Sequence, residues 1–244
     1  MIMAVVSGCA RQTGTVNVSA SATLTDAVKE INELYSQENP NVAVIANFSS
    51  AGTVQRQIEN GAPVDIFISA ASSFMDALQK EGLILDDTRK DLLTNKVVLV
   101  VPADSSLDIT DFKDLARDNV KKVAIGDPKS VSAGMYAQQI FDRNSIADII
   151  KPKLVLAGDV RQVLTYVESG NVDAGVVFIT DAKISNKVKI VANAPDDINA
   201  RVVYPVAIIK AGKNIDAARD YESFLFSNQA KAIFEKYGFS VISK

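Results

Sequence analysis

The chain has 244 residues, of which 48% are hydrophobic and 23% are charged, and its net charge is −3. A chain of this length buries a substantial core in one α/β domain or in two lobes, and its negative charge argues against a nucleic-acid partner, which requires a basic face. Histidine is absent, which excludes histidine triads, zinc sites with histidine ligands and a histidine general base, and the one cysteine excludes an internal disulfide and multi-cysteine metal sites.

The one cysteine follows a short apolar segment at the N-terminus. Residues 1–6 are mostly apolar, and Cys9 ends the segment VSGC before a polar stretch at 10–15. This pattern resembles the end of a bacterial lipoprotein signal, although the basic start and the longer apolar region of a complete signal are missing. We therefore expect 1–15 to be a signal remnant and tether with Cys9 as the lipidation site, and the alternative is an exposed thiol without a role. No apolar run is long enough to cross a bilayer.

Residues 16–35 combine a short strand, a turn of small hydroxyl residues and an amphipathic helix. The apolar residues of 24–35 recur at spacings of three and four, which predicts a helix that is buried on one side. Thr23 precedes this run, so its hydroxyl is expected either to cap the helix or to face a ligand. The first amide groups of a helix lack intrahelical partners and readily bind an anion.

The order of strand, polar turn and helix recurs along the chain. Strands are predicted at 42–48, 64–68, 97–101, 123–125, 153–156, 174–178, 188–192 and 201–209. Helices are predicted at 53–60, 74–81, 87–93, 111–117, 135–143, 160–169, 216–226 and 229–237. This alternation indicates α/β architecture with parallel sheets and right-handed crossovers. Because there are too many units for one small sheet, we expect a first lobe of 16–101 plus 203–244 and a second lobe of 102–202.

Four turns of small polar residues each follow the end of a strand and open a helix. They lie at 21–23, 49–52, 132–134 and 158–160. Ligands collect at such positions in open α/β sheets. Two of the turns belong to each expected lobe, so facing lobes would bring four helix N-termini to one cleft. Since each helix end carries about half a positive charge, four of them offset a dianion without a lysine or arginine.

Several segments resemble the periplasmic molybdate-binding proteins of bacterial molybdate importers. They are, in chain order, SASATLTDAVKEI, FSSAGTVQRQIENGAPVDIFISA, VAIGDPKSVSAGMYA, DVRQVLTYVE, RVVYPVAIIK and KAIFEKYGF, and the resemblance covers 16–243. It implies the type II two-lobed periplasmic-binding-protein fold, with a mainly parallel sheet flanked by helices in each lobe and the ligand in the interlobe cleft. It also implies a monomeric extracytoplasmic protein, periplasmic or lipid-anchored, that captures molybdate or tungstate and delivers it to the membrane permease of an ABC importer, without catalysis and without a cofactor.

The resemblance places ligand contacts at Thr23, Ala51, Ala133, Val160 and Phe178. Thr23 keeps the hydroxyl of the family's serine, whereas Ala51 and Phe178 lack the hydroxyls of the family's second serine and its tyrosine. Ala133 and Val160 correspond to positions that contribute backbone N–H groups. Each hydrogen bond to a charged group contributes about 1.5–3 kcal/mol, so the two missing donors would weaken anion binding unless other groups replace them.

Ser50, Ser132 and Tyr136 lie in or beside the expected ring of contacts. We expect at least one of their hydroxyls to turn toward the ligand, and the alternative is that ordered water or backbone N–H groups fill the gaps. Asp65, inside an apolar strand, is expected to bond to backbone or to a neighbouring hydroxyl. Arg161 is expected to be a solvated surface residue, and the alternative is that it lends positive charge to the cleft.

Other functions are less well supported by the residues. A receptor of the same fold for sulfate, chromate, phosphate or a small organic anion is the main alternative. An amino-acid receptor would need an arginine and an acidic residue, and no expected contact supplies either. An enzyme would need a nucleophile beside a base, which the sequence does not offer. An interaction-only surface protein would show no thermal shift with any small anion.

Overall fold

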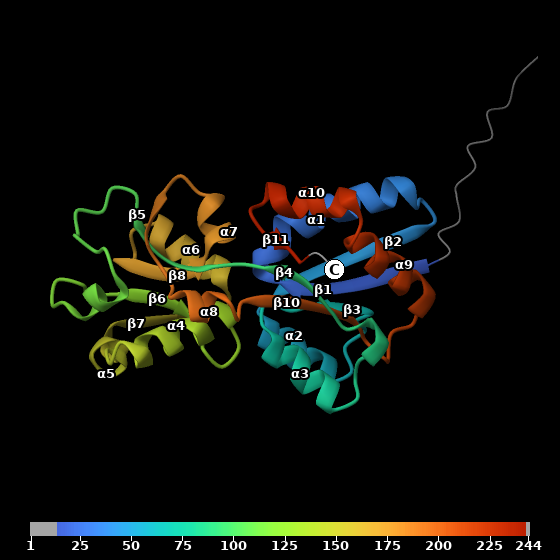
Figure 1. Cartoon of the computed structure of the whole chain (residues 1–244), viewed down its shortest axis with the longest axis horizontal. Coiled ribbons are helices and arrows are strands. Elements are labelled where there is room, and N and C mark those ends of the chain that lie inside the picture. The colour runs from blue at the N-terminus through green and yellow to red at the C-terminus, as the bar shows by residue number, and fades with distance from the viewer. Residues whose placement is uncertain (1–13, 243–244) are drawn as a thin grey trace, which may run out of the picture.

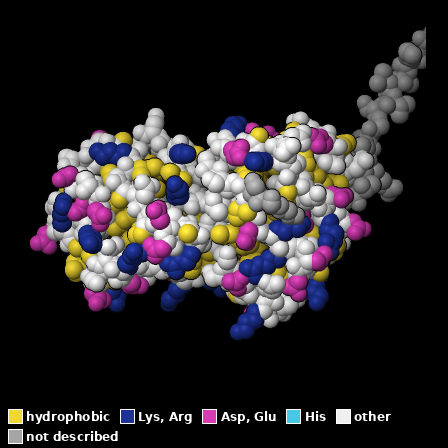
Figure 2. All heavy atoms as spheres, in the orientation of Figure 1, with side chains coloured by type: hydrophobic (Ala, Val, Ile, Leu, Met, Phe, Trp, Pro, Cys, Tyr) yellow, Lys and Arg dark blue, Asp and Glu magenta, His cyan; other side chains and the backbone are white. Residues whose placement is uncertain are grey.

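The computed structural model describes residues 14–242, which form two sheets with helices on both faces of each (Figure 1). We call the six-stranded sheet and its helices the first lobe, and the five-stranded sheet and its helices the second lobe. The lobes lie side by side along the long axis of the molecule (Figure 1). Figure 2 shows acidic and basic side chains intermixed over both lobes on one face. Cys9 lies outside the described residues.

The first lobe has the strand order β11-β4-β10-β3-β1-β2. Its strands are β1 (Gly14–Ser21), β2 (Val42–Ser49), β3 (Ile66–Ile68), β4 (Lys90–Thr94), β10 (Val203–Ile208) and β11 (Ser240–Val241). Its helices are α1 (Thr25–Glu38), α2 (Ala51–Glu59), α3 (Ser72–Lys80), α9 (Ile215–Leu225) and α10 (Asn228–Lys236). Strand β1 runs parallel to β2 and β3, so their carboxyl ends meet at one edge of the sheet.

The second lobe has the strand order β7-β6-β8-β5-β9. Its strands are β5 (Val97–Pro102), β6 (Val123–Gly126), β7 (Leu154–Ala157), β8 (Ala174–Phe178) and β9 (Val188–Asn193). Its helices are α4 (Ser132–Arg143), α5 (Ala147–Ile150), α6 (Val160–Glu168), α7 (Ile179–Lys183) and α8 (Asp196–Asn199). Short 3₁₀ helices of the chain lie at Ala22–Leu24, Asp86–Thr88, Phe112–Ala116 and Lys151–Lys153.

Burial explains why these segments form these elements. Residues 97–101 of β5 are completely buried, as expected for a strand that is covered on both faces. The buried side chains of α1 are spaced by three and four residues, and Tyr35 among them packs its ring edge-on against Tyr221 of α9, with 5.1 Å between ring centroids. Within residues 14–242, none of the helices has the length and apolar character that crossing a bilayer requires.

The expected lobe boundaries are wrong at two places. Strand β5 was expected in the first lobe, but its backbone pairs with β8 and β9, so the chain enters the second lobe just before Val97. Gly14 and Thr15 were expected in the tether, but they pair with β2 as the first residues of β1. In both cases backbone pairing with distant strands extends the lobe beyond the limit that local pattern indicated.

The predicted helix at 87–93 is also wrong. The chain forms a short 3₁₀ helix there and then strand β4, in which Leu92 and Leu93 are completely buried. Strand β4 pairs antiparallel with β10 and β11, which come from the end of the chain. The two sheets are consequently mixed and not mainly parallel, because the strands next to the crossings between lobes, β4, β5 and β10, run antiparallel to their neighbours.

Candidate functional site

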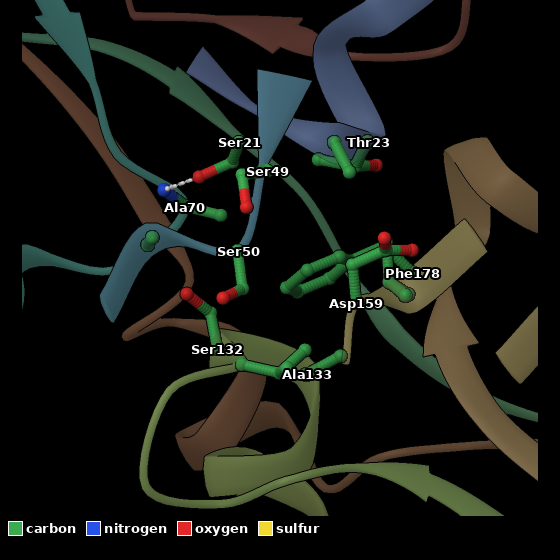
Figure 3. Close-up of a pocket in the computed structure, with 13 residues that line it drawn as sticks. Ser21, Thr23, Ser49, Ser50, Ala70, Ser132, Ala133, Asp159 and Phe178 are labelled. Atoms are coloured by element: carbon green, nitrogen blue, oxygen red, sulfur yellow. Dashed lines mark hydrogen bonds between the residues drawn. The ribbon is translucent and has the colours of Figure 1, made fainter. Parts of the chain in front are cut away.

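A small cavity lies between the lobes, where strand ends and helix starts of both lobes meet (Figure 3). The space in it that a water-sized sphere can occupy is about 10 Å³, which is about what one water molecule needs. All seven residues expected from the sequence line it: Thr23, Ser50, Ala51, Ser132, Ala133, Val160 and Phe178. The other lining residues are Ser21, Ala22, Ser49, Ala70, Val131 and Asp159. The cavity therefore has the dimensions of a site for one small ion.

Three α-helices begin at the cavity wall. Helix α2 of the first lobe begins at Ala51, and helices α4 and α6 of the second lobe begin at Ser132 and Val160. Neither α2 nor α4 has a side-chain cap. The amide groups of their first turns therefore lack intrahelical partners and direct partial positive charge at the cavity. Among the described lining residues there is no lysine or arginine, so helix ends and hydroxyls are the groups available to an anion.

Asp159 brings a negative charge to the cavity lining. Its Oδ1 accepts a hydrogen bond of 2.9 Å from the amide of Gln162, which makes it the N-cap of α6. A carboxylate in this position is stabilised by the N-terminus of its own helix. The N-terminus of α6 thus partly offsets the negative charge of Asp159.

Thr23 lines the cavity but caps no helix. The helix expected from residue 24 begins at Thr25, and Thr23 is the middle residue of a 3₁₀ turn. Its hydroxyl donates to Oδ2 of Asp181 in the second lobe at 2.9 Å and lies 3.2 Å from the Thr180 hydroxyl. The Thr23 hydroxyl therefore joins the two lobes.

A buried ion pair adjoins Thr23. Asp181 is completely buried, and its Oδ1 lies 2.8 Å from Nε of Arg161, an ion-pair contact without hydrogen-bond geometry. Burial raises the pKa of Asp181 to about 6, although the positive charge of Arg161 lowers it. Arg161 also lies 2.8 Å from Oδ2 of Asp26 in α1. The expectation that Arg161 is a solvated surface residue is wrong, because it connects carboxylates of both lobes.

The lobes also touch through their backbones. The amide of Gly52 in α2 donates to the carbonyl of Ser130, just before α4, at 2.9 Å. A Cβ atom at residue 52 would lie 2.7 Å from Cα of Ser130, a distance that real Cβ atoms essentially never show. Glycine is therefore required for this approach, and the structure represents the lobes closed over the cavity.

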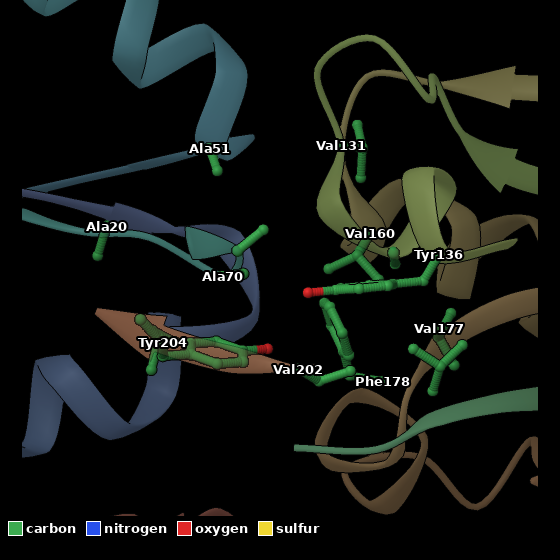
Figure 4. Packing of buried hydrophobic residues seen from close by; sticks show 14 of the residues in the cluster. Ala20, Ala51, Ala70, Val131, Tyr136, Val160, Val177, Phe178, Val202 and Tyr204 are labelled. Carbon is green, nitrogen blue, oxygen red and sulfur yellow. The ribbon is translucent and has the colours of Figure 1, made fainter. Parts of the chain in front are cut away.

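Phe178 lines the cavity, and Figure 4 shows its ring beside that of Tyr136. Its ring is 1% exposed and packs edge-on against Tyr136 and Tyr204, with centroid separations of 6.4 Å and 5.8 Å. The Tyr136 hydroxyl donates to the carbonyl of Arg201 at 2.8 Å, and burial raises the pKa of Tyr136 to about 12, so this phenol is neutral. Of the three hydroxyls considered as replacements for the missing donors, that of Tyr136 is already committed elsewhere.

Asp65 does not line the cavity and has a structural role. Its Oδ2 accepts from the amide and side chain of Asn17, and its Oδ1 accepts from the amide of Lys213 at 2.8 Å. The expectation that Asp65 bonds to backbone is confirmed. It ties β1 to the segment that precedes α9.

Sequence reasoning missed the interlobe partners Asp181, Thr180 and Asn95. Asn95 donates from Nδ2 to the Thr180 hydroxyl at 2.8 Å and to the Tyr204 hydroxyl at 3.1 Å. Each of the three is polar and stands within three residues of an end of a completely apolar strand, at 174–178 or 97–101. That position is a signal of a buried polar contact, but it does not identify the partner.

Comparison with known proteins places the chain in a family. The profile described as bacterial extracellular solute-binding protein matches residues 16–240. The chain is 41% identical over 226 residues to YvgL of Bacillus subtilis, named as a substrate-binding lipoprotein of an ABC transporter, covering 93% of this chain and 86% of YvgL. It is 39% identical over 228 residues to the molybdate-binding protein ModA of Haemophilus influenzae, covering 92% of this chain and 89% of ModA.

A solved structure agrees with these matches. The substrate-binding domain of a molybdenum ABC transporter from Clostridium difficile is 42% identical, superposes with a TM-score of 0.71, and covers 95% of this chain and 100% of that domain. The two-lobed α/β fold class expected from the sequence is confirmed. The chain belongs to the bacterial extracellular solute-binding protein family.

Proposed function

We propose that the chain captures molybdate or tungstate outside the cytoplasm and delivers it to the permease of an ABC importer. The residues that carry this function are Thr23, Ser50, Ala51, Ser132, Ala133, Val160 and Phe178, which line the interlobe cavity. The family binds solutes for transport and is not an enzyme class. The chain binds its ligand as cargo and needs no cofactor.

One observation carries the proposal: uncapped helix N-termini from both lobes meet at the interlobe cavity, whose described lining has no cationic side chain. Oriented N–H groups stabilise a spherical or tetrahedral anion from several directions, and they do so without a side chain that must lose conformational freedom. The similarity to ModA of Haemophilus influenzae and to the molybdenum transporter domain from Clostridium difficile supports a metal oxyanion as the cargo.

Closure of the two lobes is part of the proposed function. The first lobe supplies the N-terminus of α2 and the second lobe supplies those of α4 and α6, so an anion between them contacts both. The chain passes between the lobes near residues 95–96 and 200–202, which we propose as the hinge. Capture and release then correspond to closing and opening about these segments.

The lipid anchor is a separate part of the proposal. Cys9 stands in a sequence that resembles a lipoprotein signal, and YvgL of Bacillus subtilis is named as a lipoprotein. Acylation at Cys9 would hold the chain at the outer face of a membrane, because two or more acyl chains give stable anchoring. The chain would act there as a monomer beside its permease.

A panel of anions tests the cargo. The anions are molybdate, tungstate, sulfate, phosphate and chromate, added to the purified chain at 100 times the dissociation constant of the tightest binder. At this excess a specific ligand raises the unfolding free energy by about 2.7 kcal/mol, which for a chain of this size corresponds to a rise in Tm of roughly 5–10 °C.

We expect this rise with molybdate and tungstate, and smaller shifts with sulfate and phosphate because a rigid ring of donors discriminates by anion size. Calorimetric titration then gives the affinities. A rise with sulfate or phosphate alone would instead assign the chain to the alternative, a receptor of this fold for another anion.

A further inference from the structure

Five of the residues that line the cavity carry a hydroxyl: Ser21, Thr23, Ser49, Ser50 and Ser132. A hydroxyl can stabilise an oxyanion only if its single proton is not already donated to another acceptor. The hydrogen bonds of the closed structure show which of the five protons are committed. A lining hydroxyl with an uncommitted proton is able to replace a donor that is absent at Ala51 or Phe178.

Ser132 has an uncommitted proton. It is the first residue of α4 and is 3% exposed, and its Oγ is buried without any hydrogen-bond partner. Burying an unpaired hydroxyl destabilises a protein, and nearly all buried polar groups have a partner. Figure 3 shows the side chain of Ser132 next to that of Ser50. An anion in the cavity would supply the missing acceptor.

Ser49 is the second uncommitted hydroxyl. It is the last residue of β2 and lines the cavity from the first lobe, and it has no hydrogen-bond partner among the residues that the structure describes. In Figure 3 its oxygen points toward Ser50. Ser49 and Ser132 therefore present free hydroxyls to the same cavity from opposite lobes.

The Thr23 proton, by contrast, is committed. Asn95 donates to the Thr180 hydroxyl at 2.8 Å, and Thr23 donates to the Asp181 carboxylate at 2.9 Å. The 3.2 Å contact between the two threonine hydroxyls is then one in which Thr180 donates and Thr23 accepts. In this chain of hydrogen bonds the only hydroxyl proton of Thr23 is directed at Asp181 and away from the cavity.

The two remaining hydroxyls are held by other groups. Ser50 donates to the Thr53 hydroxyl at 2.8 Å, in the first turn of α2. Ser21 donates its proton to none of the described residues, but its oxygen accepts from the amide of Ala70 at 2.8 Å and is turned toward Ala70 (Figure 3). Ser49 and Ser132 are therefore the two lining hydroxyls that no hydrogen bond within the described residues holds toward another group.

We propose that Ser49 and Ser132, one from each lobe, are the side-chain donors to the bound oxyanion, and that Thr23 holds the lobes together through Asp181. This assignment rests on the proposed function and specifies its site. It explains how the chain manages without hydroxyls at Ala51 and Phe178. It also means that Thr23 contributes to anion binding through closure, and that its side chain is not a direct ligand.

Calorimetric titration with molybdate tests the donors. Ser132→Ala and Ser49→Ala should each weaken binding by about 10- to 100-fold, the loss expected for one hydrogen bond to a charged group. The matched control is Ser72→Ala, because Ser72 is also the first residue of a helix, α3, and does not line the cavity. Ser72→Ala should bind molybdate as wild type does.

Thermal unfolding without anion adds a second readout. Ser132→Ala removes an unpaired buried hydroxyl, so its anion-free Tm should equal or exceed that of wild type even though its affinity falls. Affinities of Ser132→Ala or Ser49→Ala within twofold of wild type would overturn the assignment of that serine. A wild-type chain that binds no oxyanion would overturn the proposed function itself, and this assignment with it.

Small-angle scattering without anion tests the role of Thr23. Thr23→Val keeps the side-chain shape and removes the proton donated to Asp181, so the anion-free chain should become more open and its radius of gyration should rise. Thr23→Ser keeps the hydroxyl and should scatter as wild type does. A ligand donor has no effect on the anion-free chain, so an unchanged radius for Thr23→Val would refute the interlobe role.

Discussion

Gly52→Ala isolates lobe closure from the groups that contact the anion. Gly52 does not line the cavity, and its amide donates across the cleft to Ser130. The added Cβ would lie 2.7 Å from Cα and 3.0 Å from the carbonyl oxygen of Ser130, and 2.9 Å from a ring carbon of Phe74. Two of these three contacts are with backbone, which cannot move aside without separating the lobes.

The expected loss of molybdate affinity follows from the contacts of the closed state. Overpacking of this kind destabilises the closed state by about 1–3 kcal/mol. In the open state the two contacts with Ser130 are absent, and only the contact with Phe74, which belongs to the same lobe as Gly52, remains. The substitution therefore shifts the chain toward the open state and should weaken molybdate binding by about 5- to 150-fold.

Scattering and calorimetry measure this effect together. The radius of gyration of Gly52→Ala should exceed that of wild type without anion and should approach it only at high molybdate concentration. Gly14→Ala is the control, because a Cβ there meets only Ala217, at 3.9 Å. A Gly52→Ala chain with wild-type radius and wild-type affinity would refute the reasoning that this contact sets closure.

Three further predictions concern the ion pair and Phe178. Arg161→Met leaves the buried Asp181 carboxylate unpaired and should lower the unfolding free energy by about 3–5 kcal/mol in urea titration. The control, Arg143→Met, breaks an exposed pair with Asp197 and should lower the unfolding free energy by less than about 1 kcal/mol. Equal losses in the two variants would contradict the role of Arg161. Burial raises the pKa of Asp181 from 3.8 to about 6, so between these pH values the folded chain binds one more proton than the unfolded chain. As pH rises from 4 to 6, the unfolding free energy of wild type should therefore fall relative to that of Asp181→Asn, by on the order of 1 to 3 kcal/mol. Unfolding free energies that change with pH in parallel in the two chains would contradict this pKa shift. Phe178→Tyr adds a hydroxyl at the cavity wall and should tighten molybdate binding about tenfold in calorimetry, and an unchanged affinity would show that the new hydroxyl points elsewhere.

The fold was largely predictable because its signals are local. Apolar runs such as 97–101 and 174–178 indicate buried strands, and the spacing of apolar residues in 24–35 indicates α1. Local signals failed at 90–94, where two adjacent leucines suit a helix equally well. Pairing with β10, which is more than a hundred residues away, decides in favour of a strand there.

The position of the site was predictable for a similar reason. Small polar residues after strands mark the carboxyl edge of each sheet, and residues such as Ala51 and Val160 could be placed there from local pattern and family resemblance. The hydrogen-bond partners of the site residues could not be predicted from the sequence. Thr23 donates to a residue 158 positions away, and nothing in the local sequence of either residue identifies the other.

The sequence also left open which hydroxyl replaces the missing donors. Ser50, Ser132 and Tyr136 were equivalent candidates, since each lies near the expected ring. The closed structure distinguishes them: Ser50 and Tyr136 donate to other acceptors, and only the Ser132 hydroxyl is buried without a partner. Ser49 was missed because its side-chain direction depends on the register of β2 against β1.

The most direct test of the account is the position of the metal in crystals grown with molybdate, measured by anomalous scattering at the molybdenum edge. We expect one strong peak in the interlobe cavity, among the first residues of α2, α4 and α6, with an oxygen of the anion within hydrogen-bond distance of Ser132 Oγ. A peak outside this cavity, or an empty cavity in crystals soaked with excess molybdate, would contradict the account.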